Sequence, residues 1–220
     1  MNTHHPFEFH GHTLWALAEA ALWWPAERLL CVSDLHLGKS DRIARRSGTL
    51  LPPYETQATL NRLTDLITRL DPKRVTSLGD SFDDLDAALG LPSQFKDQIS
   101  TLQAGREWIW IEGNHDPGPI DIGGRHMAEI TIAGLTFKHI ATKQGKGEIS
   151  GHYHPKCSLR AGGSRPSFLV NDTHVVLPAF GTYTGGLRSS DPILRTLMGP
   201  SATAILTGKK ALPVPMAATS

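Results

Sequence analysis

Four short clusters of Asp, His and Asn contain the residues of this sequence whose types and spacing could do chemistry. The clusters are Asp34–His36, Gly79–Asp84, Gly113–Asp116 and Gly151–His154. Carboxylate oxygens, amide oxygens and imidazole nitrogens together suit manganese, iron or zinc ions in five- or six-coordinate sites. Where two candidate ligands lie two residues apart at the end of a strand, both side chains point to the same side. The residue types and their spacing therefore predict a metal centre.

Three of the clusters directly follow a predicted buried strand, and these strands determine whether the clusters can meet. The apolar runs Arg28–Ser33, Val75–Leu78 and Trp108–Ile111 are typical of buried strands. Between them, apolar residues recur at helical spacing from Tyr54 to Leu70 and from Phe95 to Leu102. This strand–helix–strand order predicts a parallel core sheet. Because the carboxyl ends of parallel strands share one edge, we expect clusters far apart in sequence to converge there.

The second half of the chain has a different pattern. After Ile120, short apolar segments alternate with turn residues, at 130–132, 135–139, 168–170 and 175–177. Such spacing predicts a second, mostly antiparallel sheet. The expected architecture is an α/β fold in which two sheets pack face to face with helices outside.

The composition is that of an ordinary globular protein and limits how the chain can attract a partner. Its 220 residues fit one domain spanning residues 1–220. The formal net charge is +1, so any attraction of nucleic acid must be local. Two cysteines far apart in sequence suggest no disulfide framework and favour the cytoplasm. Met1–Trp15 does not resemble a secretory signal and Leu14–Ala26 is too short to span a bilayer, so no membrane association is expected.

The four clusters, in this order, resemble the pattern of the calcineurin-like metallophosphoesterase superfamily: DxH, GDxxD, GNHD or GNHE, a lone His, then GHxH. The resemblance implies a four-layer αββα sandwich with two mixed sheets and a two-metal centre. One metal would be held by Asp34, His36, Asp80 and His154. The other would be held by Asp80, which bridges the pair, and by Asn114, His139 and His152. His115 would stand beside the scissile phosphate without binding metal, and Asp116 would orient it.

The lone histidine of this pattern has three candidates. His139 ends a predicted strand and lies shortly before Gly151, which favours it. His126 lies in a glycine-rich segment, and His174 lies at a turn into a strand. The alternative for His139 is a buried histidine bonded to the main chain.

Further segments are similar to the bacterial ligase-associated DNA damage response endonucleases of the PdeM type. They are WWPAERLLCVSDLHLGKS, LLPPYETQATL, LGDSFDD, WIWIEGNHD and LPAFGTYTGGL. The similarity implies a DNA nuclease or phosphodiesterase with two divalent metal ions, manganese first and iron or zinc as alternatives. It also implies a functional association with a DNA ligase, a helicase and an exonuclease.

Several residues near the clusters are candidates for binding the substrate. Lys39, Arg42, Arg45 and Arg46 form a basic cluster after the first motif that could hold a phosphate backbone. A solvated helix face balanced by Asp41 is the competing interpretation. Tyr153 could stack on a base, although a residue between two ligands more often points into the core.

The leading hypothesis is a two-metal phosphodiesterase or endonuclease that acts on DNA, in particular single-stranded DNA, in DNA repair. A phosphatase or phosphodiesterase acting on a small nucleotide-like substrate is the alternative. A non-catalytic scaffold is disfavoured, because every ligand position of the pattern is filled.

Overall fold

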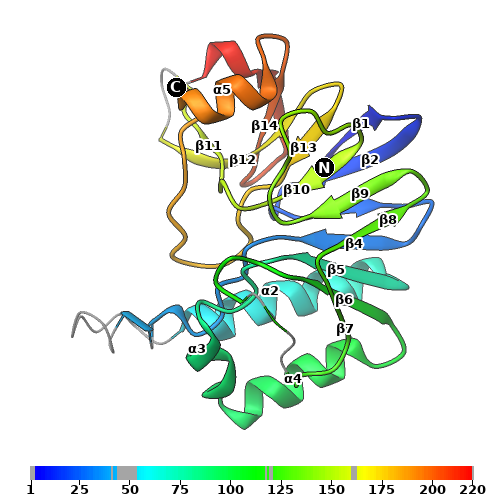
Figure 1. Cartoon of the computed structure of the whole chain (residues 1–220), viewed down its shortest axis with the longest axis vertical. Coiled ribbons are helices and arrows are strands. Elements are labelled where there is room, and N and C mark those ends of the chain that lie inside the picture. The colour runs from blue at the N-terminus through cyan, green and yellow to red at the C-terminus, as the bar shows by residue number, and fades with distance from the viewer. Residues whose placement is uncertain are drawn as a thin grey trace.

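The computed structural model describes residues 3–40, 42–43, 54–116, 118, 121–159 and 163–219 (Figure 1). Its first β-sheet has the strand order β1-β2-β3-β4-β5-β6-β7. These strands are β1 (His4–Phe9), β2 (His12–Leu17), β3 (Leu22–Trp24), β4 (Leu29–Val32), β5 (Arg74–Leu78), β6 (Glu107–Ile111) and β7 (Arg125–Met127). Neighbours from β4 to β7 are parallel, which confirms the predicted parallel core. Strands β1 to β4 add an antiparallel part that the sequence pattern did not predict.

The second sheet has the order β15-β14-β12-β13-β10-β9-β8, with β11 paired to β12. Its strands are β8 (Glu129–Ile132), β9 (Leu135–Lys138), β10 (Glu148–Ser150), β11 (Lys156–Cys157), β12 (Arg165–Val170), β13 (His174–Val176), β14 (Thr203–Leu206) and β15 (Leu212–Pro215). Most neighbours are antiparallel, but β10 runs parallel to both β9 and β13. The sheet is therefore mixed.

Helices cover the outer face of each sheet (Figure 1). On the first sheet lie α2 (Glu55–Leu70), α3 (Leu85–Leu89) and α4 (Ser93–Gln103). Helix α5 (Pro192–Met198) and the short 3-10 helix η1 (Met216–Ala218) cover the second sheet. The layers follow the order helix, sheet, sheet, helix, as expected for an αββα sandwich. Within the described ranges, no helix combines the length and the apolar character that a membrane crossing needs.

Three apolar layers hold these elements together. The buried face of α2, with Leu60, Leu63, Leu66 and Ile67, packs on the first sheet because these residues recur at helical spacing. A second cluster fills the space between the sheets and contains Trp24, Phe137, Phe168 and Ile205. A third lies between α5 and the outer face of the second sheet and contains Leu194, Met198 and Leu169. Burial of these clusters fixes the relative position of the strand ends on which the site depends.

Arg62 on α2 contacts two loop segments that lie far from it in sequence, at Glu19 and Phe180. Its guanidinium donates to the carbonyl oxygens of Phe180 (2.9 Å) and Glu19 (2.8 Å) and lies 4.4 Å from the centroid of the Phe180 ring. The amides of Phe180 and Gly181 in turn donate to the carbonyl oxygens of Ser33 and Asp34. The loop after β4 is thus supported from a helix that lies far from it in sequence.

Candidate metal centre

The sequence clusters meet at one edge of the two sheets. Two groups of side chains form there, each with one candidate ligand atom per residue lying within 4.8 Å of the others in its group. The first group is Asp34, His36 and His154, and the second is Asp80, His139 and His152. Asp34 and His36 follow β4, and Asp80 follows β5. His139 follows β9, and His152 and His154 follow β10. All six were candidate metal ligands in the sequence, and the structure brings them together.

In the first group, nitrogen and oxygen atoms face one another at short range. His154 Nε2 lies 3.1 Å from Asp34 Oδ1 and 3.4 Å from His36 Nε2. Asp34 and His36 are buried, whereas His154 is partly exposed. The group therefore has a closed inner side and an outer side that solvent can reach.

In the second group, His139 lies at the centre. Its Nε2 is 3.2 Å from His152 Nδ1, 3.5 Å from Asp80 Oδ2 and 2.9 Å from Asn114 Oδ1. Asn114 is exposed and adds an amide oxygen to this group, as the sequence pattern implied. His139 Nδ1 also lies 4.0 Å from Asp34 Oδ1, so the two groups adjoin.

The hydrogen bonds of two histidines indicate which ring nitrogen is available to a cation. His139 Nδ1 donates to the carbonyl oxygen of Leu78 at 2.7 Å, which leaves the lone pair on Nε2. His36 Nδ1 lies 2.8 Å from Asp83 Oδ1, and its Nε2 points to His154. Histidines that bind metals usually have the other ring nitrogen held in this way. Together with the two carboxylates, these lone pairs form a donor set that fits divalent metal ions.

The other two candidates for the lone histidine lie elsewhere. His174 is buried at the start of β13, with Nε2 2.7 Å from the carbonyl oxygen of Thr142. His126 lies on β7, and its ring centroid is 6.3 Å from that of Trp110. That segment is a strand rather than the glycine-rich loop expected. The geometry therefore favours His139.

The main chain at the site adopts a conformation that side-chain-bearing residues seldom take. Asp34, His36, Asp80, His152 and His154 all have φ values between 46° and 71°. Such left-handed residues cost free energy and persist only where surrounding contacts hold them. The turns that aim the candidate ligands therefore depend on specific contacts.

Two glycines allow the loops of the site to approach one another. A Cβ at Gly113 would lie 2.1 Å from the Asp80 nitrogen, and a Cβ at Gly151 would lie 1.7 Å from Ser33 Oγ. Both distances are far shorter than any non-bonded contact. These glycines are thus required by close approach of neighbouring loops.

Asp116 holds the loops after β5 and β6 together. Its buried carboxylate accepts hydrogen bonds from the amides of Asp80 (2.9 Å), Ser81 (2.8 Å), Phe82 (3.2 Å) and Gly113 (3.1 Å). Burial, together with the nearby charge of Asp80, raises the pKa of Asp116 to about 6, although the amides oppose the shift. Asp116 is therefore the contact that keeps Asp80 in its left-handed conformation.

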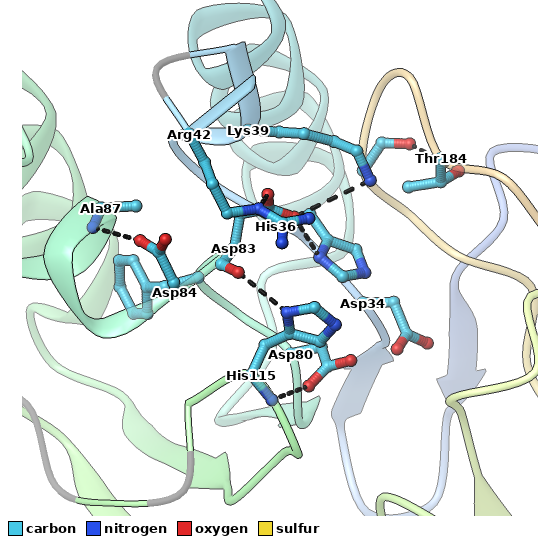
Figure 2. Close-up of polar contacts among 12 residues, drawn as sticks. Asp34, His36, Lys39, Arg42, Asp80, Asp83, Asp84, Ala87, His115 and Thr184 are labelled. Carbon is cyan, nitrogen blue, oxygen red and sulfur yellow. Dashed lines mark hydrogen bonds and ion pairs between the residues drawn. The ribbon is translucent and has the colours of Figure 1, made fainter. Parts of the chain in front are cut away.

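The sequence pattern assigned Asp116 to the orientation of His115, but in the structure the two side chains have other hydrogen-bond partners. His115 was expected to be oriented by Asp116, but its Nδ1 is bonded to the carbonyl oxygen of Asp83 at 2.9 Å. The amide of His115 donates to Asp80 Oδ1 at 2.9 Å, and its ring centroid lies 5.4 Å from that of His36 (Figure 2). The reason is that four main-chain amides already occupy the Asp116 carboxylate.

Asp83 is a residue of the site to which the sequence interpretation gave no role. Its carboxylate is fully buried and meets three basic groups: His36 Nδ1, Lys39 Nζ at 3.7 Å and Arg42 Nε (Figure 2). Burial alone would raise the pKa of Asp83, but His36, Lys39 and Arg42 outweigh it and lower the pKa. The signal for this role was present, because Asp83 is the last residue of the GDxxD pattern.

The residues expected to bind substrate differ in where the structure places them and in which partners they have. Lys39 and Arg42 lie at the site but already have Asp83 as a partner, and both side chains are largely buried. Arg45 and Arg46 lie outside the described residues. Tyr153 is half-buried, with its ring centroid 5.1 Å from that of His152. Tyr153 therefore lies beside the candidate ligands rather than deep in the core.

The charges of the second group favour a bound cation. Burial would raise the pKa of Asp80, but the hydrogen bond and charge of His139 and the amide of His115 hold it well below its usual range. Burial would lower the pKa of His139, but Asp80 and Asp34 raise it. The pKa of His152 is lowered by burial and by the charge of His139. An ion that binds here would displace the proton from His139 Nε2.

The site opens to solvent through two hollows. One, of about 330 Å³, is lined by His152, Tyr153, His154, Gly186 and Leu187. The other, of about 290 Å³, is lined by Glu112, Gly113, Asn114, Ala128, His139 and Ile140. An extended substrate could therefore lie across the site from one hollow to the other.

Comparisons with known proteins agree with this geometry. The profile of the family described as calcineurin-like phosphoesterase matches residues 27–193, a range that contains all four clusters. Among solved structures, the chain is similar to nuclease MPE of Pseudomonas putida, with a TM-score of 0.76 and 29% sequence identity. That likeness covers 96% of this chain and 100% of the other. A search of curated proteins finds no match.

We expect His139→Ala to remove the ion of the second group, because Nε2 of His139 faces every other donor of that group. Elemental analysis after loading with manganese should give about one ion per chain where the unaltered protein binds about two. His126→Ala is the matched control and should keep both ions. Equal metal content in His139→Ala and the unaltered protein would contradict the assignment.

We expect Asp83→Asn to weaken metal binding although Asp83 lies outside both groups. The substitution removes the charge beside His36 Nδ1, and such partners typically contribute roughly 10- to 100-fold in metal affinity. Asp84→Asn is the control, since Asn can still accept the amide of Ala87 at the start of α3. Competition with a chelator measures both variants, and equal affinities would show that Asp83 does not act through His36.

Proposed function

Because the chain belongs to the calcineurin-like phosphoesterase family and is a metal-dependent hydrolase, we propose that it hydrolyses phosphodiester bonds in DNA as a two-metal endonuclease. The observation that carries the proposal is the juxtaposition of two donor groups beside two open hollows. The likeness to a protein described as a nuclease supports a nucleic-acid substrate.

The proposed ligands follow from the two groups. Asp34, His36 and His154 would hold one ion, His139, His152 and Asn114 would hold the other, and Asp80 would be a ligand to both. A set of carboxylates, imidazoles and one amide suits manganese, which we propose as the metal, with iron and zinc as alternatives. When bound, divalent ions neutralise phosphate oxygens and lower the pKa of water.

His115 is proposed to act on the substrate without binding metal. Its Nδ1–H donates to the Asp83 carbonyl oxygen, which fixes the ring and directs Nε2 away from that bond. In the protonated ring, Nε2–H can donate to a phosphate oxygen or give its proton to the leaving oxygen. The Asp83 carbonyl accepts from Nδ1 in either protonation state, so the orientation of the ring is kept throughout.

The biological setting is a further part of the proposal. The segments similar to ligase-associated endonucleases support a role in DNA repair, on single-stranded DNA, together with a ligase, a helicase and an exonuclease. The two cysteines, Cys31 and Cys157, are free and buried, which supports a reducing compartment such as the cytoplasm. We propose that residues 1–220 act as one domain.

A second candidate is a phosphatase or phosphodiesterase acting on a small nucleotide-like substrate. The observation that favours it is the pairing of Lys39 and Arg42 with Asp83, which leaves less positive charge for flanking phosphates of a polynucleotide. Hollows of about 290 and 330 Å³ are also large enough for a small ligand.

A matrix of metals and substrates separates the two candidates. The metals are manganese, zinc, iron, magnesium and none; the substrates are single-stranded DNA, duplex DNA, RNA, bis-p-nitrophenyl phosphate and p-nitrophenyl phosphate. The proposal requires metal-dependent cleavage of DNA and of the diester in preference to the monoester. Preference for the monoester, with DNA left intact, would favour the second candidate.

We expect His115→Ala to lower turnover while the metal content stays near that of the unaltered protein. General acid–base groups typically contribute on the order of 100- to 10,000-fold. Added imidazole should restore part of the activity, because it can occupy the space of the missing ring. Loss of metal on this substitution would instead identify His115 as a ligand.

A further inference from the structure

We propose that a hollow between Tyr153, Lys143 and helix α5 binds the nucleoside next to the scissile phosphate. We name this hollow the α5 pocket; it has a volume of about 220 Å³, and Ile193 and Leu197 form its wall on the α5 side. The inference rests on the proposed function, because it assigns a place to one part of the proposed substrate.

The position of the α5 pocket connects it to the metal centre. Tyr153 lines both this pocket and the hollow that contains His152 and His154. Ala141, which also lines the α5 pocket, follows His139 by two residues. A substrate whose phosphate lies between the two donor groups would therefore have its next nucleoside beside the Tyr153 ring.

The walls of the pocket have the chemistry that a nucleoside requires. Tyr153 offers an aromatic ring for stacking, which every base can use. Ile193 is 56% exposed, so the apolar wall lies open to a ligand. The volume of about 220 Å³ exceeds the ~150 Å³ of a cavity that holds benzene, so one base and part of a sugar fit.

Lys143 provides the positive charge at the rim. It lies on the loop between β9 and β10, which is fixed because the Glu148 carboxylate accepts from the Thr142 amide (2.8 Å) and hydroxyl (2.7 Å). The Thr142 carbonyl oxygen is also bonded to His174 Nε2 at 2.7 Å. Among the described residues, no acidic side chain pairs with Lys143, in contrast to Lys39 and Arg42. Its ammonium is therefore available to the oxygen atoms of a bound nucleoside.

The test compares substrates that share a leaving group and differ in the nucleoside. They are thymidine 5′-(p-nitrophenyl phosphate), thymidine 3′-(p-nitrophenyl phosphate) and bis-p-nitrophenyl phosphate. Lys143→Ala and Ile193→Ser are the test variants. Lys146→Ala, on the same loop but outside the pocket, and Leu89→Ser, an exposed apolar residue of α3, are the matched controls.

We expect each test variant to lower one ratio, that of kcat/KM for at least one thymidine ester to kcat/KM for bis-p-nitrophenyl phosphate. The decrease should be on the order of tenfold and mainly through KM, as for the loss of a hydrogen bond to a charged group or of an apolar contact. The controls should keep the ratio of the unaltered protein. An unchanged ratio in both test variants, or an equal change in the controls, would overturn the proposal.

A binding measurement separates this inference from the proposed function. Fluorescence anisotropy of a labelled five-nucleotide oligodeoxythymidylate in EDTA reports binding by the full chain without hydrolysis. Weaker binding by the test variants than by the controls supports the pocket even if the metal and substrate matrix shows no DNA cleavage. Equal binding by all variants refutes the pocket even if DNA is cleaved.

Discussion

The carboxylate of Asp116 is the contact on which the geometry of the metal centre depends. It accepts four main-chain amides from two loops that follow neighbouring strands, and so keeps Asp80 in a left-handed conformation. Each of these hydrogen bonds involves a charged acceptor in a buried place, where such bonds are stronger than in water. Without them, the turn after β5 would relax towards a conformation that aims Asp80 elsewhere. Asp80 belongs to the second donor group and lies 3.5 Å from His139, which adjoins Asp34 of the first group, so a change in its direction would disturb the centre.

Several buried carboxylates lie at the same edge of the sheets, and nearby donors and cations compensate their negative charge. Asp34, Asp80, Asp83 and Asp116 are all buried within a small region. Burying several carboxylates without partners would be too costly for a domain of marginal stability. Main-chain amides donate hydrogen bonds to Asp116, whereas Lys39 and Arg42 form ion pairs with Asp83. Asp34 and Asp80 have only histidines, a hydroxyl and amides as close partners among the described residues, which leaves them as the place for bound cations.

Sequence reasoning could predict the ends of the strands but not all the contacts between the loops. Apolar runs and turn residues located β4, β5 and β6, and the parallel arrangement then required the clusters to meet. The antiparallel arrangement of β1 to β3 was not predicted, because His4–Phe9 contains only two large apolar residues and those of Leu14–Ala26 do not alternate regularly. The roles of Asp83 and Asp116 were missed for another reason. Asp116 acts through main-chain amides of two loops, and such contacts have no spacing rule in sequence. Asp83 is the last residue of the GDxxD pattern, but that pattern does not show that its carboxylate meets the side chains of His36, Lys39 and Arg42.

The pairing of Lys39 and Arg42 with Asp83 also changes where substrate recognition is expected. A basic side chain beside a catalytic centre can bind the substrate or neutralise a buried acid, and proximity in sequence does not distinguish the two. Among the described residues, the side chains that compensate the buried Asp83 carboxylate are these two cations and His36, so releasing the cations to a phosphate would leave Asp83 poorly compensated. That cost favours recognition by groups that are free before the substrate arrives. Among the described residues Lys143 meets this condition, so we propose the selective contacts on the side of the second sheet, whereas Lys39 and Arg42 supply the supporting charges beside the first.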